Sequence, residues 1–402
     1  MTALQGIRVL ELGQFIAGPY CAQVLGDHGA EVIKVERPGT GDAMRLWGVH
    51  HGDGPPMWWP VIGRNKKSVA VDLKSDQGKA LVRRLALSCD VIVENFRPGT
   101  LERLGLAPDE LLAERPGLVV ARISGFGQTG PYRQRAGFGG VAEAMGGLRF
   151  LTGEPERPPV RVGLAIGDTL AGLFTAFGVL AALRQRDLTG RGQVVDTGLT
   201  DAVVAVLESV LSEYGSSGAV RRRSGNTLPG IAPSNIYPTR DERWVVIGAN
   251  ADGPFQRLCE AMGVPELARD PRLEGHEGRG RHQQELDELI ATWTEQRSLA
   301  EILAVLEAAG VPAGPVNSAA DVAGDPHFRE RGTVLEVESE MGRLLMQGVV
   351  PRLTGTPGSV RWAGPPLGAH TEAVLRDALG LDATAIGELA DRHVVELGPT
   401  SW

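Results

Sequence analysis

The chain has 402 residues and a net charge of −8, from 41 basic and 49 acidic side chains. Apolar residues make up 42% and charged residues 22%, which excludes a disordered or fibrous chain. The acidic balance argues against a general nucleic-acid binder, although a local cluster of basic residues can still bind a small anion. The cysteines, Cys21, Cys89 and Cys259, form no CxxC pair, so we predict neither a disulfide framework nor a zinc site.

We expect a soluble, cytoplasmic protein with no membrane partner. The start, MTALQGIRVLELG, lacks the basic and apolar regions of a secretory signal. The longest apolar stretch, 170–183, is interrupted by Gly and Thr and is shorter than the roughly 20 residues of a membrane span. Widely spaced thiols also fit a reducing compartment.

The first half of the chain alternates short apolar runs with helical patterns. This order predicts an α/β fold with a parallel sheet covered by helices on both faces. Strands that are buried on both faces are apolar throughout, as these runs are. The predicted strands are 7–12, 31–36, 69–73, 90–95 and 118–123, and a further strand is expected in QVVDTGL after a long helix over 168–187. Because this helix is apolar nearly all round, we predict that it is buried.

The composition changes near residue 215, where GSSGAVRRRSGNTLPG has little periodicity, and again near 325. The stretch between these points is predicted to be a smaller α+β unit. Its expected elements are the strand WVVIGA and helices over 253–263, 282–293 and 298–309. A hairpin of TVLEVES with GRLLMQG follows, and then helices over 370–379 and 383–393.

The segment GFGQTG (125–130) matches the G-x-G-x-x-G pattern of dinucleotide-binding proteins and follows a predicted strand. However, Pro131 comes next and no helix opens there to receive a pyrophosphate. We therefore predict a glycine turn. The chain has no G-x-x-x-x-G-K-[ST] phosphate loop, which argues against an ordinary kinase or ATPase, and no G-x-S-x-G elbow, which argues against an α/β-hydrolase. Because the histidines are scattered and no H-E-x-x-H motif is present, we predict no metal site.

Asp168 follows Gly167 at the predicted start of the long apolar helix. One interpretation is an N-cap aspartate, a residue type that is preferred at that position. In the other, the helix N-terminus keeps the carboxylate ionised in an apolar site, where it attacks an activated acyl group. The residues alone leave both interpretations open.

Basic side chains follow the ends of several predicted strands, where ligands bind in open α/β sheets. They predict either a site for a phosphate-bearing nucleotide or a solvated basic rim. These residues are Arg37, Lys66, Lys67, Lys74, Arg97 and Arg103.

Several long motifs, in order, resemble those of class III coenzyme A transferases, the family of formyl-CoA:oxalate transferase, carnitine CoA-transferase and α-methylacyl-CoA racemase. They are FIAGPYCAQVLGDHGAEVIKVERPGTGD, GRNKKSVAVDLKSDQGK, DVIVENFRPGTLERLGL, ISGFGQTGPY and VGLAIGDTLAGLFTAFGVLAALRQRDLTGRGQVVDTGL. The resemblance implies a large Rossmann-like domain that begins with 1–199, a linker over 200–224, a small domain over 225–325, and a segment 326–402 that contains a second linker and the return to the large domain. It also implies an interlocked homodimer, with coenzyme A as a substrate and no tightly bound cofactor or metal.

The family's catalytic aspartate falls on Asp168. The resemblance implies that its carboxylate attacks the acyl-CoA thioester to give a mixed anhydride, from which an aspartyl-CoA thioester forms. Family contacts to coenzyme A fall on Ile16, Ala17, Arg37, Val71, Lys74, Asn95, Phe96 and Arg103.

Two departures from the family pattern reduce the number of activities that we expect for this chain. Racemases carry a His-Asp pair after GPY, where this chain has Phe138 and Gly139, and Phe cannot exchange a proton. The loop 224–235 lacks the glycine run of formyl-CoA:oxalate transferase and follows three arginines, which end at Arg223. We therefore expect an acceptor such as succinate, glutarate, malate or citramalate.

The candidate substrate residues are Phe138, Gly139, Arg223 and Asn226. An arginine fork suits a second carboxylate, although the three arginines are also consistent with a solvated linker. The predicted function is an acyl-CoA:carboxylate CoA-transferase of acyl-CoA metabolism, with succinyl-CoA as candidate donor. The alternatives are a 2-methylacyl-CoA racemase of the same fold and a CoA-binding module without catalysis.

Overall fold

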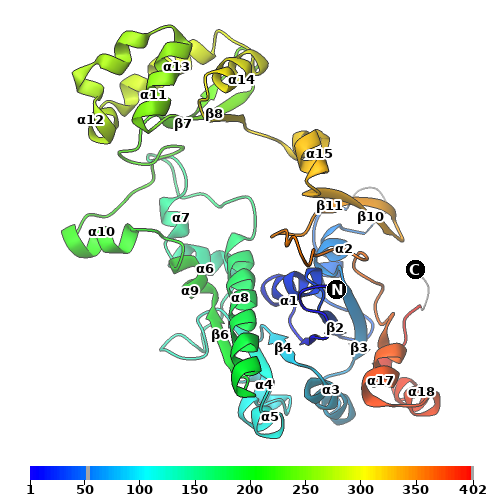
Figure 1. Cartoon of the computed structure of the whole chain (residues 1–402). Coiled ribbons are helices and arrows are strands. Elements are labelled where there is room, and N and C mark those ends of the chain that lie inside the picture. Colours follow the sequence, from blue (N-terminus) through cyan, green and yellow to red (C-terminus); the bar gives the residue numbers. More distant parts are fainter. Residues whose placement is uncertain (51–54, 400–402) are drawn as a thin grey trace. The chain divides into compact units, whose positions relative to one another are not determined.

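The structure is a computed structural model that describes residues 1–50 and 55–399 (Figure 1). The chain forms two compact units. The first unit contains Met1–Leu148, Val162–Leu211 and the part of the chain from Asp325 onward; the second contains Arg149–Arg161 and Ser212–Gly324. The sequence did not predict that residues 149–161 belong to the second unit.

The first unit is built on a seven-stranded sheet with the order β12-β3-β2-β1-β4-β5-β6. All neighbours pair in parallel except β12, which lies antiparallel to β3 at one edge. The order from β3 to β6 is that of a doubly wound α/β fold, which confirms the predicted parallel sheet. The strands are β1 (Arg8–Glu11), β2 (Glu31–Glu36), β3 (Lys66–Val71), β4 (Val91–Glu94), β5 (Val119–Ser124), β6 (Val194–Gly198) and β12 (Val395–Glu396).

Successive strand residues enter two separate hydrophobic cores, because side chains alternate across a sheet. In β1, for example, Val9 joins one core and Leu10 the other. One core packs against α1 (Ala17–Asp27), α6 (Gly139–Met145), α8 (Ile166–Thr189) and α9 (Leu199–Val204). The other packs against α3 (Asp76–Ser88), α4 (Thr100–Arg103), α5 (Pro108–Glu114), α17 (Thr371–Leu379) and α18 (Ala383–Asp391).

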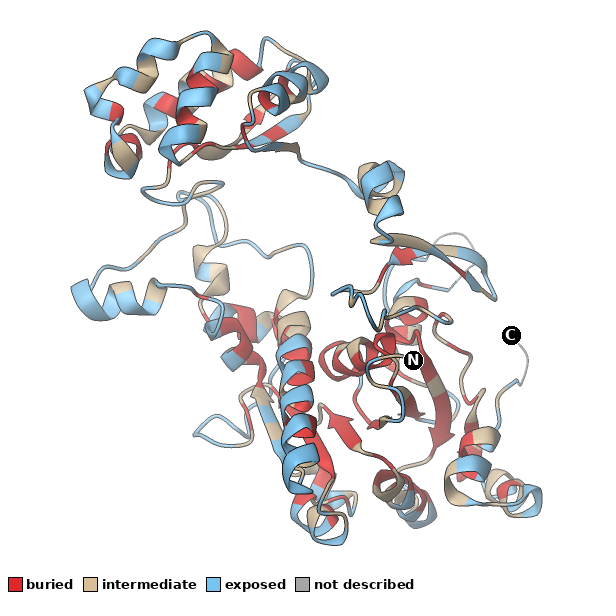
Figure 2. Ribbon diagram, in the orientation of Figure 1, coloured by how far each residue is buried: buried red, intermediate tan, exposed pale blue. Residues whose placement is uncertain are grey.

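The long helix α8 differs from its prediction in two ways. It begins at Ile166, so Asp168 is the third helical residue, and Ala165 rather than Asp168 is the N-cap. The prediction that the helix is buried all round is also wrong, because only one of its faces packs against α1, β5 and β6. The opposite face exposes large apolar side chains (Figure 2), namely Leu173, Phe174, Phe177 and Leu180.

By length and composition, α8 is the one helix in the described part of the chain that could cross a membrane. Its small residues instead fit close packing within the first unit. A Cβ atom added at Gly172 would lie 2.7 Å from the main-chain oxygen of Ala17 in α1. The contact between α1 and α8 is therefore close enough to require glycine.

The second unit has a three-stranded antiparallel sheet, β7 (Ser234–Pro238), β8 (Trp244–Gly248) and β9 (Ala313–Pro315). The helices α11 (Asp252–Met262), α13 (Gln283–Thr294) and α14 (Leu299–Ala308) confirm the three predicted there, and α12 (Gly275–Arg281) precedes α13. The predicted linker 200–224 is not without structure, because it contains most of α9 and α10 (Val210–Ser217).

The remaining elements are a hairpin and several short helices. The predicted hairpin is confirmed by β10 (Val334–Ser339) and β11 (Gly342–Gln347), which pair antiparallel. Short helices are α2 (Trp58–Ile62), α7 (Leu148–Leu151), α15 (Ala319–Gly324) and α16 (Pro326–Glu330).

Candidate active site

A pocket of about 190 Å³ lies at the carboxyl ends of β4 and β5 and contains Asp168. This is the edge of a doubly wound sheet at which ligands bind. The pocket brings together six of the residues predicted from the sequence. They are Ala17, Asn95, Phe96, Arg97, Phe138 and Asp168.

Asp168 enters the pocket from the first turn of α8, where the helix dipole favours a negative charge. The main chain of Gly139, at the start of α6, lies directly against its carboxylate. A Cβ atom added at Gly139 would lie 1.9 Å from Oδ2 of Asp168. The lack of a side chain at residue 139 therefore makes room for this carboxylate in its observed position.

An aromatic cluster centred on Trp47 includes the pocket residues Phe15 and Phe138. The ring centroid of Trp47 lies 5.5 Å from that of Phe15 and 6.4 Å from those of Phe138 and Trp58. Of these residues, only Phe138 was predicted from the sequence. The others come from separate segments. Phe15 begins the family motif FIAGPY, whereas no motif contains Trp47 or Trp58. Together they give the pocket an apolar rim in which rings contact through their edges.

A buried network of charged groups is joined to the pocket residue Phe15 through Asp42. Lys34 forms ion pairs with Glu11 at 2.9 Å and with Asp42 at 2.7 Å, and it also donates to the main-chain oxygen of Gly13. Lys66 forms an ion pair with the second oxygen of Glu11 at 2.8 Å. All four charged side chains are fully or almost fully buried, so each depends on its partners for compensation.

This network holds the loop between β1 and α1 that carries Phe15. Asp42 accepts hydrogen bonds from the main-chain N–H groups of Phe15 (3.2 Å) and Met44 (3.0 Å). Asn95 accepts from the N–H of Gln14 and donates to its oxygen, both at 2.7 Å. These bonds fix Phe15 at a φ of 63°, a left-handed conformation that is uncommon outside glycine.

The pKa of Asp42 is held below its ordinary value. Burial by itself opposes ionisation, but the charge of Lys34 and the hydrogen bonds to the carboxylate outweigh it. The same ion pairs raise the pKa of Lys34 against the effect of its own burial. The pair is therefore ionised at neutral pH.

Two basic residues that we considered as phosphate ligands are engaged elsewhere. β3 begins at Lys66, which donates to the main-chain oxygen of Pro19 besides pairing with Glu11. Lys67 pairs with Glu31 at 2.6 Å. Both lysines lie at the amino end of β3, away from the edge that holds Asp168, so the prediction is wrong for them.

The other residues predicted to contact coenzyme A follow the carboxyl ends of β2, β3 and β4. Arg37, Lys74 and Arg103 are exposed there, and Nη2 of Arg103 donates to Oγ1 of Thr100 at 2.8 Å. Val71 is buried as the last residue of β3, and Ile16 is buried as the N-cap of α1. Their roles toward a ligand stay predictions.

Glu94 supports the start of the segment that carries Asn95 and Phe96. Its carboxylate accepts from the N–H of Phe96 at 2.7 Å and pairs with Arg122 at 2.7 Å. Burial raises the pKa of Glu94 to about 6, and the opposing effect of Arg122 does not cancel this shift.

The two predicted substrate residues of the loop after residue 220 belong to the second unit. Asn226 is exposed. Arg223 donates to the main-chain oxygens of Phe150 (3.1 Å) and Glu154 (3.3 Å), and the nearby Arg221 pairs with Glu213. Arg221 and Arg223 thus both have partners within their own unit.

The family model of CoA-transferase family III matches residues 4–371. The chain belongs to this family. It is 53% identical, over 98% of both chains, to the succinyl-CoA–D-citramalate CoA-transferase of Chloroflexus aurantiacus. It is 36% identical to the succinate–glutarate CoA-transferase of Agrobacterium fabrum, over 95% of this chain and 97% of the other.

Among solved structures, a CAIB/BAIF family protein from Brucella suis superimposes with a TM-score of 0.83 at 36% identity. The match covers 94% of this chain and 99% of that one. The protein is therefore a CoA-transferase with the mixed α/β fold of its family, as the sequence predicts.

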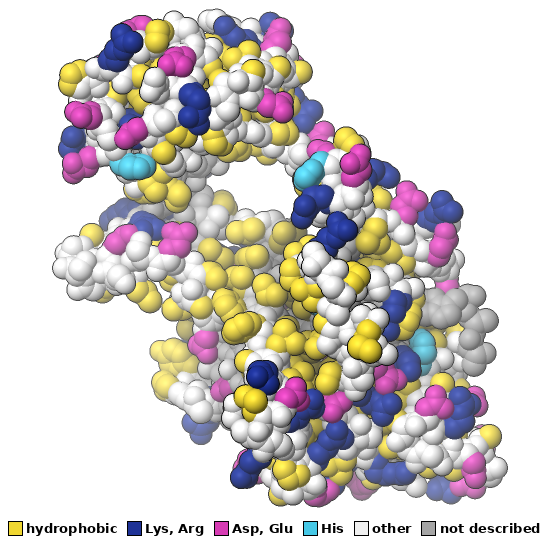
Figure 3. Space-filling view, viewed as in Figure 1, with side chains coloured by type: hydrophobic (Ala, Val, Ile, Leu, Met, Phe, Trp, Pro, Cys, Tyr) yellow, Lys and Arg dark blue, Asp and Glu magenta, His cyan; other side chains and the backbone are white. Residues whose placement is uncertain are grey.

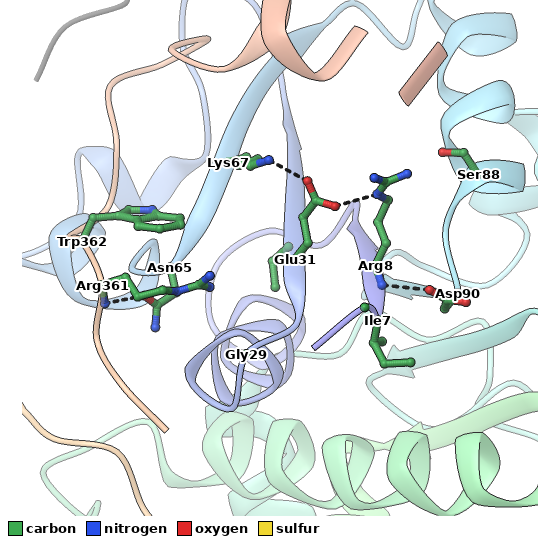
Figure 4. Close-up of a pocket in the computed structure, with 12 residues that line it drawn as sticks. Ile7, Arg8, Gly29, Glu31, Asn65, Lys67, Ser88, Asp90, Arg361 and Trp362 are labelled. Carbon is green, nitrogen blue, oxygen red and sulfur yellow. Dashed lines mark hydrogen bonds and ion pairs between the residues drawn. The ribbon is translucent and has the colours of Figure 1, made fainter. Parts of the chain in front are cut away.

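This family III CoA-transferase also has a larger cavity, of about 470 Å³, at the amino ends of β1 and β2 (Figure 4). Here Glu31 pairs with both Arg8 (2.7 Å) and Lys67 (2.6 Å), and the main-chain N–H of Arg8 donates to Asp90. These groups already compensate one another, and the cavity lies at the edge of the sheet opposite to Asp168. We therefore assign the active site to the smaller pocket.

Across residues 1–50 and 55–399 of the transferase, no three His, Cys, Asp or Glu side chains are grouped so that they could hold a metal ion. Its cysteines are free thiols, and all of them are buried. Burial raises the pKa of Cys89 to about 12, so this thiol is not a nucleophile at neutral pH.

Proposed function

We propose that this enzyme transfers coenzyme A from succinyl-CoA to a second dicarboxylic acid, with Asp168 as the nucleophile. The observation that carries the proposal is the position of Asp168 in a pocket at the carboxyl edge of the sheet. The names of the relatives support the substrate class. They pair succinyl-CoA with D-citramalate, with L-malate and with glutarate, all of which are dicarboxylates.

In the first half of the reaction, an oxygen of Asp168 attacks the thioester carbonyl of succinyl-CoA. The C–S bond breaks, and the products are an aspartyl mixed anhydride and the CoA thiolate. The thiolate then attacks the aspartyl carbonyl, which releases succinate and leaves an aspartyl-CoA thioester. The apolar rim around the pocket limits access of water, which would otherwise hydrolyse these intermediates.

In the second half, the acceptor carboxylate attacks the aspartyl-CoA thioester and forms a new mixed anhydride. The released thiolate attacks the acceptor's acyl carbon, which yields the new acyl-CoA and restores the carboxylate of Asp168. Each step exchanges one acyl bond for another, so the electrons balance without a redox cofactor.

Coenzyme A lies, in this proposal, along the carboxyl ends of β2, β3 and β4. Basic side chains there suit its phosphates, and the neighbouring apolar and amide groups suit its remaining parts. The phosphate candidates are Arg37, Lys74 and Arg103, and the other proposed contacts are Ile16, Ala17, Val71, Asn95 and Phe96.

The racemase alternative is not favoured by any contact of the site. A two-base racemase needs a proton-transferring partner for the aspartate. At the place where racemases of the family carry a His-Asp pair, this chain has Phe138 and Gly139, and neither side chain can accept a proton.

The proposed assembly is an interlocked homodimer in the cytoplasm. The exposed apolar face of α8 supports the dimer, and hydrophobic side chains gather over this region of the surface (Figure 3). Phe177, with 71% of its surface exposed, is the most exposed residue of that face. An uncovered face of large apolar residues is typical of a subunit interface.

The function is tested by incubating the protein with succinyl-CoA and single acids, with new thioesters identified by mass spectrometry. We expect new acyl-CoA species with citramalate, malate or glutarate, and none in the Asp168→Asn variant, which keeps the shape of the side chain. Full turnover by that variant would contradict the assignment of Asp168. Deuterium uptake at the α-carbon of a 2-methylacyl-CoA, without any acceptor, would instead support the racemase.

A further inference from the structure

Arg135 places a cationic group in the same pocket as Asp168. We propose that its guanidinium binds the second carboxylate of the succinyl group and of the dicarboxylic acceptor. The inference rests on the proposed function and specifies how the enzyme selects dicarboxylates. It replaces the earlier expectation that an arginine near residue 223 has this role.

The segment that carries Arg135 is fixed against the end of β5. A Cβ atom added at Gly137 would lie 2.4 Å from the Cα of Gly125, so the two main chains are in direct contact. Phe138 and Gly139 follow at once, and Gly139 lies against the carboxylate of Asp168. Arg135 itself is exposed, and it stands two residues before Gly137 and four residues before Gly139, the residue that lies against the nucleophile.

The guanidinium is oriented by an aromatic ring. Its Cζ atom lies 3.6 Å from the ring centroid of Tyr132. The main chain forms a turn here, because the main-chain N–H of Arg135 donates to the main-chain oxygen of Tyr132 at 2.8 Å. Tyr132 in turn packs edge-on against Phe126, with centroids 5.9 Å apart. Stacking holds one flat face of a guanidinium and leaves the in-plane N–H donors available to a carboxylate.

The charge of Arg135 is not compensated by a carboxylate anywhere in the described ranges 1–50 and 55–399. Arg97, which also lines the pocket, likewise has no carboxylate partner in these ranges, whereas Arg45 and Arg122 do. Arg45 pairs with Glu36 at 2.8 Å, and Arg122 pairs with both Glu94 and Glu102. A ligand carboxylate would supply the partner that Arg135 lacks.

A second arginine, Arg97, also lines the pocket. It follows Asn95 and Phe96 and precedes Pro98, within the segment that we propose for coenzyme A. Arg135 instead belongs to the segment that leads to Phe138 and Gly139, on the side of the acyl group. In this proposal, Arg97 lies near the coenzyme A part of the substrate and Arg135 lies near its acyl group.

This assignment makes a specific demand on both substrates. Donor and acceptor acyl groups are joined to the same Asp168 in turn, so their distal carboxylates reach the same place. A carboxylate among aromatic side chains is costly unless it is paired, so acyl groups that end in a methyl group gain nothing from Arg135. Selectivity for succinyl-CoA over butyryl-CoA therefore measures the contribution of Arg135.

The experiment measures binding by calorimetry in the inactive Asp168→Asn protein, with succinyl-CoA, butyryl-CoA and free coenzyme A as probes. In the Arg135→Gln variant we expect the Kd of succinyl-CoA to rise about 10- to 100-fold, the range for loss of a hydrogen-bonded charge. The Kd values of butyryl-CoA and free coenzyme A should change less than about threefold, because substitutions of surface residues usually have small energetic effects. Arg135→Lys should restore part of the affinity for succinyl-CoA.

Arg133→Gln is the matched control, because Arg133 is exposed, lies two residues away and does not line the pocket. Equal losses for all three probes in Arg135→Gln would assign Arg135 to coenzyme A and overturn the proposal, and so would unchanged binding. A wild-type protein that transfers coenzyme A to no dicarboxylic acid would contradict the proposed function. A wild type that transfers, combined with unchanged selectivity in Arg135→Gln, would refute only the role of Arg135.

Discussion

Gly139→Ala tests whether the close approach between α6 and Asp168 sets the geometry of the nucleophile. The added Cβ atom would lie 1.9 Å from Oδ2 and 2.7 Å from Cγ of Asp168. Neither distance is compatible with van der Waals contact, so the carboxylate must rotate or α6 must shift. An off-rotamer side chain costs about 0.5–1.5 kcal/mol, and one extra methyl group in a packed site costs about 1–3 kcal/mol.

If this free energy is added to the activation barrier of the attack by Asp168, kcat/KM for succinyl-CoA should drop roughly 5- to 150-fold, since 1.36 kcal/mol corresponds to tenfold in rate. The free energy of unfolding should fall by at most about 3 kcal/mol, the upper end for overpacking. Steady-state kinetics and urea unfolding measure the two effects. Gly163→Ala is the control, because a Cβ atom there meets nothing within 4 Å. Activity of Gly139→Ala within twofold of wild type, or an equal loss in Gly163→Ala, would refute this reasoning.

Three further predictions concern stability and assembly. Asp42→Asn leaves the buried Lys34 without one of its carboxylates, so urea unfolding should show a loss of about 3 kcal/mol, the lower end for breaking a buried pair; an unchanged midpoint would contradict this. The raised pKa of Glu94 stabilises the fold below pH 4.5, and this contribution is lost as the pH rises through 6. The wild type should thus lose about 2 kcal/mol relative to Glu94→Gln between pH 4.5 and 7, whereas a pH-independent difference would be evidence against the shift. Phe177→Glu should convert the proposed dimer to a species of about one chain mass in sedimentation, while a wild type that sediments as a monomer would remove the basis of the dimer.

The parallel sheet was predictable because its strands are apolar on both faces, as the runs around Val9, Val32 and Val91 show. The residue at which β3 begins could not be predicted from the sequence. Lys66 resembles a surface residue in the sequence, but in the fold it is buried against Glu11, which lies 55 positions earlier in the chain. A buried ion pair leaves no local signal, because each partner becomes compatible with burial only through the other.

The helix α8 was predictable from its spacing, whereas its burial was not. Leu173 and Phe177 have the periodicity of core residues, yet they are exposed in the single chain. Periodicity shows that a face is apolar but does not identify what covers it. The helix also starts two residues earlier than predicted. Its start carries no sequence signal, because the N-cap residue, Ala165, has no side chain that could cap the helix.

For the site, Asp168 was identified by its motif and by its place near a helix start. The aromatic rim was missed, because Phe15, Trp47 and Trp58 lie in separate segments of the chain with no shared pattern. The left-handed conformation of Phe15 is imposed by distant partners, among them Asp42. Such conformations are set by tertiary contacts rather than by local propensity.

The central claim is that Asp168 becomes covalently linked to coenzyme A during turnover. It is tested most directly by mixing the protein with succinyl-CoA, reducing with borohydride and mapping the product by peptide mass spectrometry. We predict that the carboxyl group of Asp168 is reduced to the alcohol only when succinyl-CoA is present, and that the Asp168→Asn variant stays unmodified. An unmodified Asp168 peptide in protein that turns over, or modification at another carboxylate, would contradict the mechanism.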